Sequence, residues 1–284
     1  MRLTPRDLEI LRHVARHRFL NSSQIATLIG GSAQQLLRRL QRLFHGGHLD
    51  RPRAQLSYFT PGGTRPMVYG LARAGARALA VPGQTRASPD NRTVKQLYLQ
   101  HTLLVADAMI AFQRACRAGH APRLLQEEDL APGRPPSTAF KWTVPVARGD
   151  ERRRTGLFPD RTFALEDTAT GERVLCFLEA DRATMPVTRR SLMQSSYIRK
   201  LLAYEATWTQ GVHRERFGVS RFRVLTVTTT PARATHLAAA CEGLTRARGL
   251  FLFTDIASIT AAPSVLTLDW ISANPDKPGR VWDA

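Results

Sequence analysis

The stretch from Ser32 to His45 constrains the fold of this chain more than any other part of the sequence. At helical pitch, its apolar residues gather on one side and its polar residues on the other. The apolar side holds Leu36, Leu37, Leu40, Leu43 and Phe44, and the polar side holds Gln34, Gln35, Arg38, Gln41, Arg42 and His45. Ser32 is a typical N-cap, and two glycines follow His45, where a left-handed backbone ends a helix. The sequence therefore predicts an amphipathic helix with one buried face.

The polar side of this helix has the chemistry of base recognition. Arginine can donate two hydrogen bonds to guanine in the major groove of DNA, and glutamine can pair with adenine there. The residues predicted to contact DNA are Gln34, Gln35, Arg38, Arg39, Gln41, Arg42 and His45, together with Arg65 in a later loop. The alternative is a basic helix face that contacts only water.

The flanking segments place this helix in a larger motif. Thr4 is the expected cap of the first helix, and Asn21 or Ser22 that of the second. The predicted elements are helices over 5–17, 22–29, 32–45 and 72–79 and strands over 49–53 and 67–71, the strands joined by a turn-rich loop over 57–66. This order is that of a helix-turn-helix followed by a wing, and it resembles the winged-helix DNA-binding domains of bacterial regulators.

Charge supports a polyanionic partner. The chain carries a formal net charge of +18. Residues 1–86 contain fourteen arginines against three acidic residues, a net charge of +11. Nucleic acid is favoured over a membrane surface, because the sequence shows no apolar run of membrane-spanning length, no signal peptide and no lipidation motif. The three cysteines are widely spaced without metal-ligand spacing, so we predict a cytoplasmic protein, associated with the nucleoid or a plasmid, without a zinc site.

A stretch rich in turn-forming residues marks the predicted domain boundary. The predicted organisation is a DNA-binding domain over 1–82, a linker over 83–93 and a second domain over 94–284 with an α/β fold, α+β for the whole chain. The second domain is expected to contain helices over 94–117, 191–205 and 231–247, strands over 124–130, 139–146, 162–166, 173–181, 221–228 and 249–254, and a charged loop over 148–154, with a mobile solvated turn as the alternative.

Three carboxylates are expected to meet at one end of the 162–181 hairpin. Asp160 precedes the first strand, and Glu179 and Asp181 lie at the end of the second. Side chains alternate along a strand, so Glu179 and Asp181 point to the same side, and the antiparallel return brings them beside Asp160. Three such carboxylates repel one another unless a hard cation such as Mg²⁺ lies between them. The pattern therefore predicts a metal site suited to nuclease chemistry.

These residues carry a resemblance to a known fold. Pro159-Asp160, the hairpin, Glu179-x-Asp181 and the following helix look like the PD-(D/E)XK nuclease fold, in which the acidic residues hold Mg²⁺ or Mn²⁺. The resemblance implies a mixed central sheet. In that fold a lysine two residues after the glutamate positions the attacking water, but here Asp181 occupies its place. Lys200, on the next predicted helix, is the candidate substitute, and exposure to solvent is the equal alternative.

The whole chain, with a winged helix before such a domain, resembles the replication-relaxation family of plasmids and other mobile elements. The resemblance implies double-stranded DNA binding in plasmid replication, relaxation or transfer, and it allows a homodimer and replication or relaxase partner proteins. The basic residues Arg182, Arg189, Arg190 and Arg199 would suit phosphate contact. Three functions follow in order of preference: a DNA-binding protein with a degenerate nuclease-like domain, a metal-dependent endonuclease or nickase, and a winged-helix transcriptional regulator that responds to a small molecule.

Overall fold

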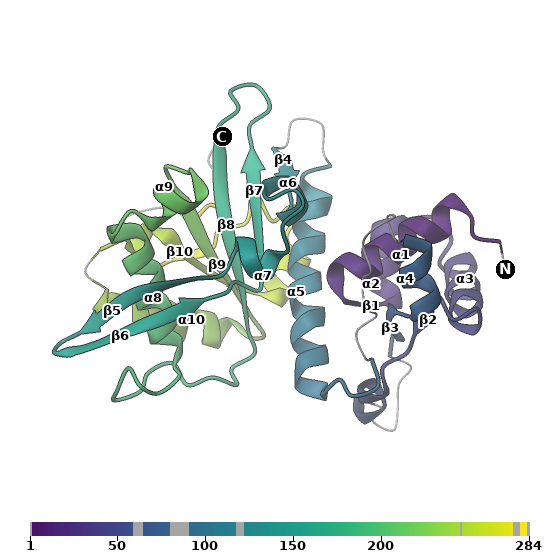
Figure 1. Ribbon diagram of the computed structural model, residues 1–284, viewed down its shortest axis with the longest axis horizontal. Helices are drawn as coiled ribbons and strands as arrows, with labels where there is room; N and C mark the ends of the chain where they lie inside the picture. The colour runs from purple at the N-terminus through teal and green to yellow at the C-terminus, as the bar shows by residue number, and fades with distance from the viewer. Residues whose placement is uncertain are drawn as a thin grey trace. The chain divides into compact units, whose positions relative to one another are not determined.

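The computed structural model describes residues 2–58, 65–79, 91–117, 122–244, 246–274 and 279–282. The chain forms two compact units, Met1–Ile110 and Ala111–Ala284 (Figure 1), and the division between them falls within the residue range of α5 (Gln96–Ala115). Most of the predicted linker over 83–93 lies outside the described residues, so that domain division stays a prediction.

The amino-terminal unit begins with three capped helices. Thr4, Asn21 and Ser32 each accept a hydrogen bond from a backbone N–H in the first turn, as their residue types predict. The elements, in order, are α1 (Pro5–His17), β1 (Phe19–Asn21), α2 (Ser22–Ile29), α3 (Ala33–His45), β2 (Leu49–Asp50), a 3₁₀ helix (Arg53–Tyr58), β3 (Val68–Leu71), α4 (Arg73–Leu79) and the first part of α5. The predicted helices over 5–17, 22–29, 32–45 and 72–79 are confirmed.

A small antiparallel sheet, in the order β1-β3-β2, closes this unit. The predicted strand over 49–53 was too long, because pairing with β3 stops after Asp50. The side chain of Gln55 then takes over: its Oε1 accepts from the Val68 N–H at 2.9 Å, and its Nε2 donates to the Val68 carbonyl. A side chain on a 3₁₀ helix therefore replaces backbone pairing there. Most of the predicted loop over 57–66 lies outside the described residues.

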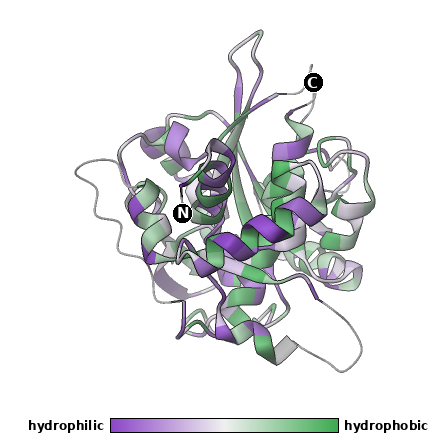
Figure 2. Cartoon of the chain, turned by 90° about the vertical axis from the view of Figure 1, so that its right-hand side faces the viewer, coloured by the Kyte–Doolittle hydropathy of each residue, from purple (hydrophilic) through white to green (hydrophobic). Residues whose placement is uncertain are grey.

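The core of the unit follows the apolar stripes of the helices. Buried side chains come from α1, α2 and α3 and include Ile10, Leu11, Val14, Ile25, Leu28, Leu36, Leu40 and Leu43. Figure 2 shows hydrophilic and hydrophobic segments alternating along the helices. Leu37 is the exception to the predicted apolar face, since it is 50 % exposed. The buried stripe of α3 is therefore narrower than predicted.

An ion pair ties α1 to α3. The Asp7 carboxylate is fully buried, and it accepts hydrogen bonds from the Arg39 guanidinium and from the Thr4 N–H and hydroxyl. Burial alone would raise the pKa of Asp7, but these donors outweigh it and lower the pKa from 3.8 to about 2.

Asp7→Asn is expected to destabilise the amino-terminal unit by about 2 kcal/mol near neutral pH. A lowered folded-state pKa contributes stability above the unfolded pKa and loses it as pH falls. The difference between wild type and variant should therefore shrink as pH falls from about 5 to 2. Hydrogen exchange of the α1 amides measures it. A difference that does not change over this pH range would contradict the assignment.

The second unit is built on a mixed sheet of six strands in the order β11-β10-β9-β8-β7-β4. The β8–β9 and β9–β10 pairs are parallel, and the other pairs are antiparallel. The α/β class and the mixed central sheet are thus as predicted. After α5 the elements are β4 (Arg123–Leu125), α6 (Glu127–Leu130), α7 (Pro136–Ala139), β5 (Trp142–Arg148), β6 (Glu151–Leu157), β7 (Arg161–Glu166), β8 (Arg173–Asp181), α8 (Tyr197–Thr209), α9 (Val212–Phe217), β9 (Phe222–Thr228), α10 (Pro231–Ala240), β10 (Phe251–Asp255), α11 (Ile256–Ala261) and β11 (Ile271–Ser272).

The predicted charged loop over 148–154 is wrong, because most of it forms β6. This strand pairs with β5 along its whole length, from Trp142↔Leu157 to Arg148↔Glu151, and only Gly149-Asp150 forms a turn. Arg152 and Arg154 remain exposed. One face of the two-stranded ribbon is exposed to solvent, so charged side chains can occupy it. The local composition alone is typical of a loop, which explains the wrong prediction.

Other boundaries moved as well. The helix predicted over 191–205 begins only at Tyr197, and the helix predicted over 231–247 ends at Ala240. The strand predicted over 124–130 is limited to β4 and gives way to α6. The β5–β6 hairpin packs against α8, as Figure 1 shows, and α10 packs against β9 and β10. No helix within the described ranges is long and apolar enough to cross a membrane.

Candidate nucleic-acid interface and carboxylate site

The polar face of α3 is open to solvent. All six polar residues predicted for that face are exposed: Gln34, Gln35, Arg38, Gln41, Arg42 and His45. Within the described part of the chain, the guanidinium groups of Arg38 and Arg42 have no hydrogen-bond or ion-pair partner. Their donors are therefore available to an external ligand.

Two of the predicted DNA-contacting residues stand apart from this face. Arg39 is held against Asp7 and Thr4 on the side of α1, so its guanidinium supports the fold. Arg65 is exposed and lies shortly before β3, in the loop predicted over 57–66, most of which lies outside the described residues. Leu37 shares the exposed side of α3 and adds an apolar surface beside the arginines.

In the second unit, the hairpin places Asp160 where its register predicts. The Asp160 N–H donates to the Leu178 carbonyl at 3.1 Å, and its Oδ2 accepts from the Ala180 N–H at 2.8 Å. Asp160 thus lies across from the end of β8, beside Glu179. The carboxylate of Asp160 is already engaged by backbone.

Glu179 is buried on β8, where α8 covers it. Its Oε2 accepts from the Lys200 Nζ at 2.5 Å and its Oε1 from the Tyr204 hydroxyl at 2.6 Å. Burial raises the pKa of the Glu179 carboxyl to about 7, with Lys200 opposing the rise and Asp160 adding to it. Burial would lower the pKa of Lys200, but the carboxylates of Glu179 and Asp160 raise it. The Lys200 ammonium group therefore points toward the sheet, although part of the side chain is exposed.

Asp181 has a cationic partner of its own. Its Oδ2 accepts from the Arg233 Nε at 2.6 Å, and its Oδ1 lies 3.3 Å from the Arg233 Nη2. The same Nη2 also donates to the Met185 carbonyl at 2.7 Å. Arg233, on α10, therefore joins the end of β8 to the segment that follows it.

The donor set does not fit a divalent cation. Both oxygens of Glu179 and both of Asp181 already accept hydrogen bonds from protein donors. Among the residues that the structure describes, no three His, Cys, Asp or Glu side chains are grouped so as to hold a metal ion. The side chains of Lys200 and Arg233 supply the positive charge that the sequence led us to expect from a metal ion.

The sequence pointed to Lys200 as a partner of the carboxylates, but it did not link Tyr204 or Arg233 to them. Tyr204 lies one turn from Lys200 on α8, and this i, i+4 spacing was the available signal. Arg233 follows β9 in the first turn of α10, but only the parallel register Asp181↔Thr228 brings it beside Asp181. That register depends on the tertiary structure, so no local sequence pattern predicts it.

The fold and sites define an α/β protein with an amino-terminal unit that exposes a basic helix and a second unit that buries ion-paired carboxylates. A family model described as replication-relaxation matches residues 11–221, which is more than half of the chain. The chain therefore belongs to the replication-relaxation family, and membership suggests a role in plasmid or mobile-element replication or relaxation. No curated protein and no solved structure matches it.

Proposed function

We propose that the protein binds double-stranded DNA during replication, relaxation or transfer of a plasmid or mobile element. In this proposal the amino-terminal unit acts as a winged helix, and α3 enters the major groove. The observation that carries the proposal is the exposed polar face of α3, on which the guanidinium groups of Arg38 and Arg42 have no partner within the described residues. The +11 charge of residues 1–86 adds attraction to the phosphate backbone.

Binding-site selection from a random duplex library tests the proposal. A sequence-reading protein enriches a defined motif, and its affinity falls steeply with salt because phosphate contacts release counterions. A palindromic motif is expected if the protein binds as a homodimer on paired half-sites. No enrichment, together with no salt-dependent binding to any duplex, would contradict the proposal.

The second candidate function is a Mg²⁺- or Mn²⁺-dependent endonuclease or nickase. Lys200 beside Glu179 is the observation in its favour, since a lysine next to the acidic pair is what the nuclease resemblance implies. The hydrogen bonds of the carboxylates argue against nuclease activity, because the oxygens of Glu179 and Asp181 already accept from Lys200, Tyr204 and Arg233. We therefore propose that the second unit is a degenerate nuclease-like scaffold.

Supercoiled plasmid incubated with the pure protein and Mg²⁺ or Mn²⁺ is expected to stay supercoiled. The matched control is the Glu179→Ala variant, purified in parallel, which reports contaminating nucleases. Nicking by the wild type that vanishes in Glu179→Ala and Asp160→Ala would replace the scaffold proposal with the nuclease.

A transcriptional regulator that responds to a small molecule has less support. Its expected feature is an enclosed apolar pocket in the second unit. The pocket lined by Arg148, Arg189 and Arg190 is open and basic, so it is not that feature.

A further inference from the structure

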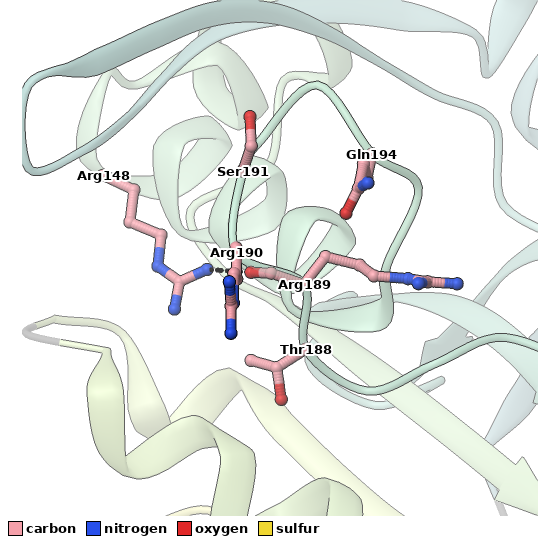
Figure 3. A pocket seen from close by; sticks show the side chains of 6 residues that line it. All are labelled: Arg148, Thr188, Arg189, Arg190, Ser191 and Gln194. Atoms are coloured by element: carbon pink, nitrogen blue, oxygen red, sulfur yellow. Dashed lines mark hydrogen bonds between the residues drawn. The ribbon is translucent and has the colours of Figure 1, made fainter.

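A basic pocket of about 600 Å³ opens between the tip of the β5–β6 hairpin and the connection from β8 to α8. Its lining residues are Arg148, Thr188, Arg189, Arg190, Ser191 and Gln194 (Figure 3). The carboxylate site does not use these residues. Three of the six side chains are cationic, and the others offer hydroxyl or amide donors, so the lining suits an anion.

The loop that carries Arg189 and Arg190 is held at both ends. Val187 and Leu192, on either side of the arginine pair, are buried in the core. The Leu192 N–H donates to the Glu151 carboxylate on β6 at 2.6 Å, and the Ile198 N–H donates to the Val187 carbonyl at 2.9 Å. The arginines therefore project from a short segment fixed to both the hairpin and the helix.

The cationic groups of the pocket are not neutralised internally. Arg189 and Arg190 are exposed, and within the described ranges neither forms an ion pair with a carboxylate. Arg148 donates through Nη1 to the Arg189 carbonyl at 2.9 Å, which brings it to the loop and leaves its remaining N–H groups for a ligand. The Glu151 carboxylate lowers this charge only in part. A net positive pocket with unused guanidinium donors is the usual environment of phosphate groups.

The arrangement of the side chains favours an extended anion over a small one. In Figure 3, the guanidinium groups of Arg148 and Arg190 lie on one side of the loop, and the Arg189 side chain extends away from both. Guanidinium groups that spread in this way can contact successive phosphates, whereas a single phosphate is held best by converging donors. We propose that this pocket binds the sugar-phosphate backbone of DNA, as a contact separate from α3; the inference rests on the proposed DNA-binding function.

The test compares two double variants of the full chain. R189A/R190A removes two guanidinium groups from the pocket, and R214A/R246A removes the same charge from exposed positions of the same unit outside it. Affinity for the selected duplex is measured over a range of salt concentrations. R189A/R190A is expected to reduce the slope of log affinity against log salt by about 1–2 and to weaken binding about 10- to 100-fold near 0.1 M salt. R214A/R246A is expected to behave as wild type.

Calorimetric titration with inorganic phosphate and with a mononucleotide separates the possible sources of the phosphate. Weak or no binding of both, with the expected change in salt slope, supports a backbone site. Three results overturn the inference: an unchanged slope in R189A/R190A, an equal loss in both variants, or tight mononucleotide binding that R189A/R190A abolishes without changing duplex affinity. If wild type binds no duplex at all, the proposed function itself fails and this inference fails with it.

Discussion

Arg38→Ala and Arg42→Ala are each expected to lower the affinity for the selected DNA site about 10- to 100-fold while changing the affinity for random duplex much less. Each base-reading arginine contributes roughly 1–3 kcal/mol of discrimination through its two hydrogen bonds to guanine. Both side chains are exposed, so the substitutions leave the core of the unit intact. Competition binding with selected and scrambled duplexes measures the ratio.

The matched control for the two substitutions combined, R38A/R42A, is R73A/R77A, which removes two exposed arginines from α4 and so the same charge from the same unit. Its effect should be uniform across sequences, because such residues act only through the general attraction to phosphate. Equal losses on both duplexes for Arg38→Ala and Arg42→Ala would show that α3 does not read bases at those positions.

Lys200→Met is expected to destabilise the second unit by about 3 kcal/mol, because it leaves the Glu179 carboxylate buried without its cation. The Glu179 side chain is only 2 % exposed, whereas Lys200 is 29 % exposed, which puts the cost at the low end for a buried pair. All four tryptophans lie in this unit, so denaturant unfolding followed by tryptophan fluorescence reports on it alone.

The size of this loss should depend on pH. Burial already raises the pKa of Glu179 to about 7, and removing Lys200 removes an interaction that lowers it. A carboxyl whose folded-state pKa is raised costs stability as pH rises through the interval between its unfolded and folded values. The destabilisation of Lys200→Met should therefore grow from pH 6 to pH 8.5.

The control for this prediction is E179Q/K200M, which removes both charges and should recover most of the lost stability, since no buried charge remains. A loss below about 0.5 kcal/mol for Lys200→Met, or no recovery in the double variant, would show that the pair does not stabilise the fold. The scaffold proposal would then lose its physical basis.

Much of the amino-terminal unit could be predicted because its signals are local. Caps such as Thr4 and Ser32, and the glycines after α3, fix helix ends within a few residues. The apolar stripe of α3 is an equally local signal. The buried face predicted from it was wrong only at Leu37, which the packing of α1 and α2 leaves exposed. Arg39 could not be assigned from the helix alone, because its partner Asp7 lies on α1.

In the second unit, the sequence predicted those features that depend on the alternation of residues along the strands. The β7–β8 hairpin and the placement of Asp160 beside Glu179 follow from alternation and register. The sequence did not reveal that the carboxylates are paired with cationic side chains, because Lys200 and Arg233 reach them from two separate helices. Strand β6 was missed because its stability comes from pairing with β5, while its own sequence reads as a charged loop.

Methylation protection tests the proposed contact of Arg38 and Arg42 on α3 with guanine in the major groove of a specific site. Dimethyl sulfate methylates guanine N7, which is one of the two atoms that an arginine fork contacts. Wild-type protein is expected to protect particular guanines of the selected duplex from methylation, and R38A/R42A is expected to lose protection at those guanines while R73A/R77A keeps it. Full binding without guanine protection, or protection that persists in R38A/R42A, would contradict the proposed contact.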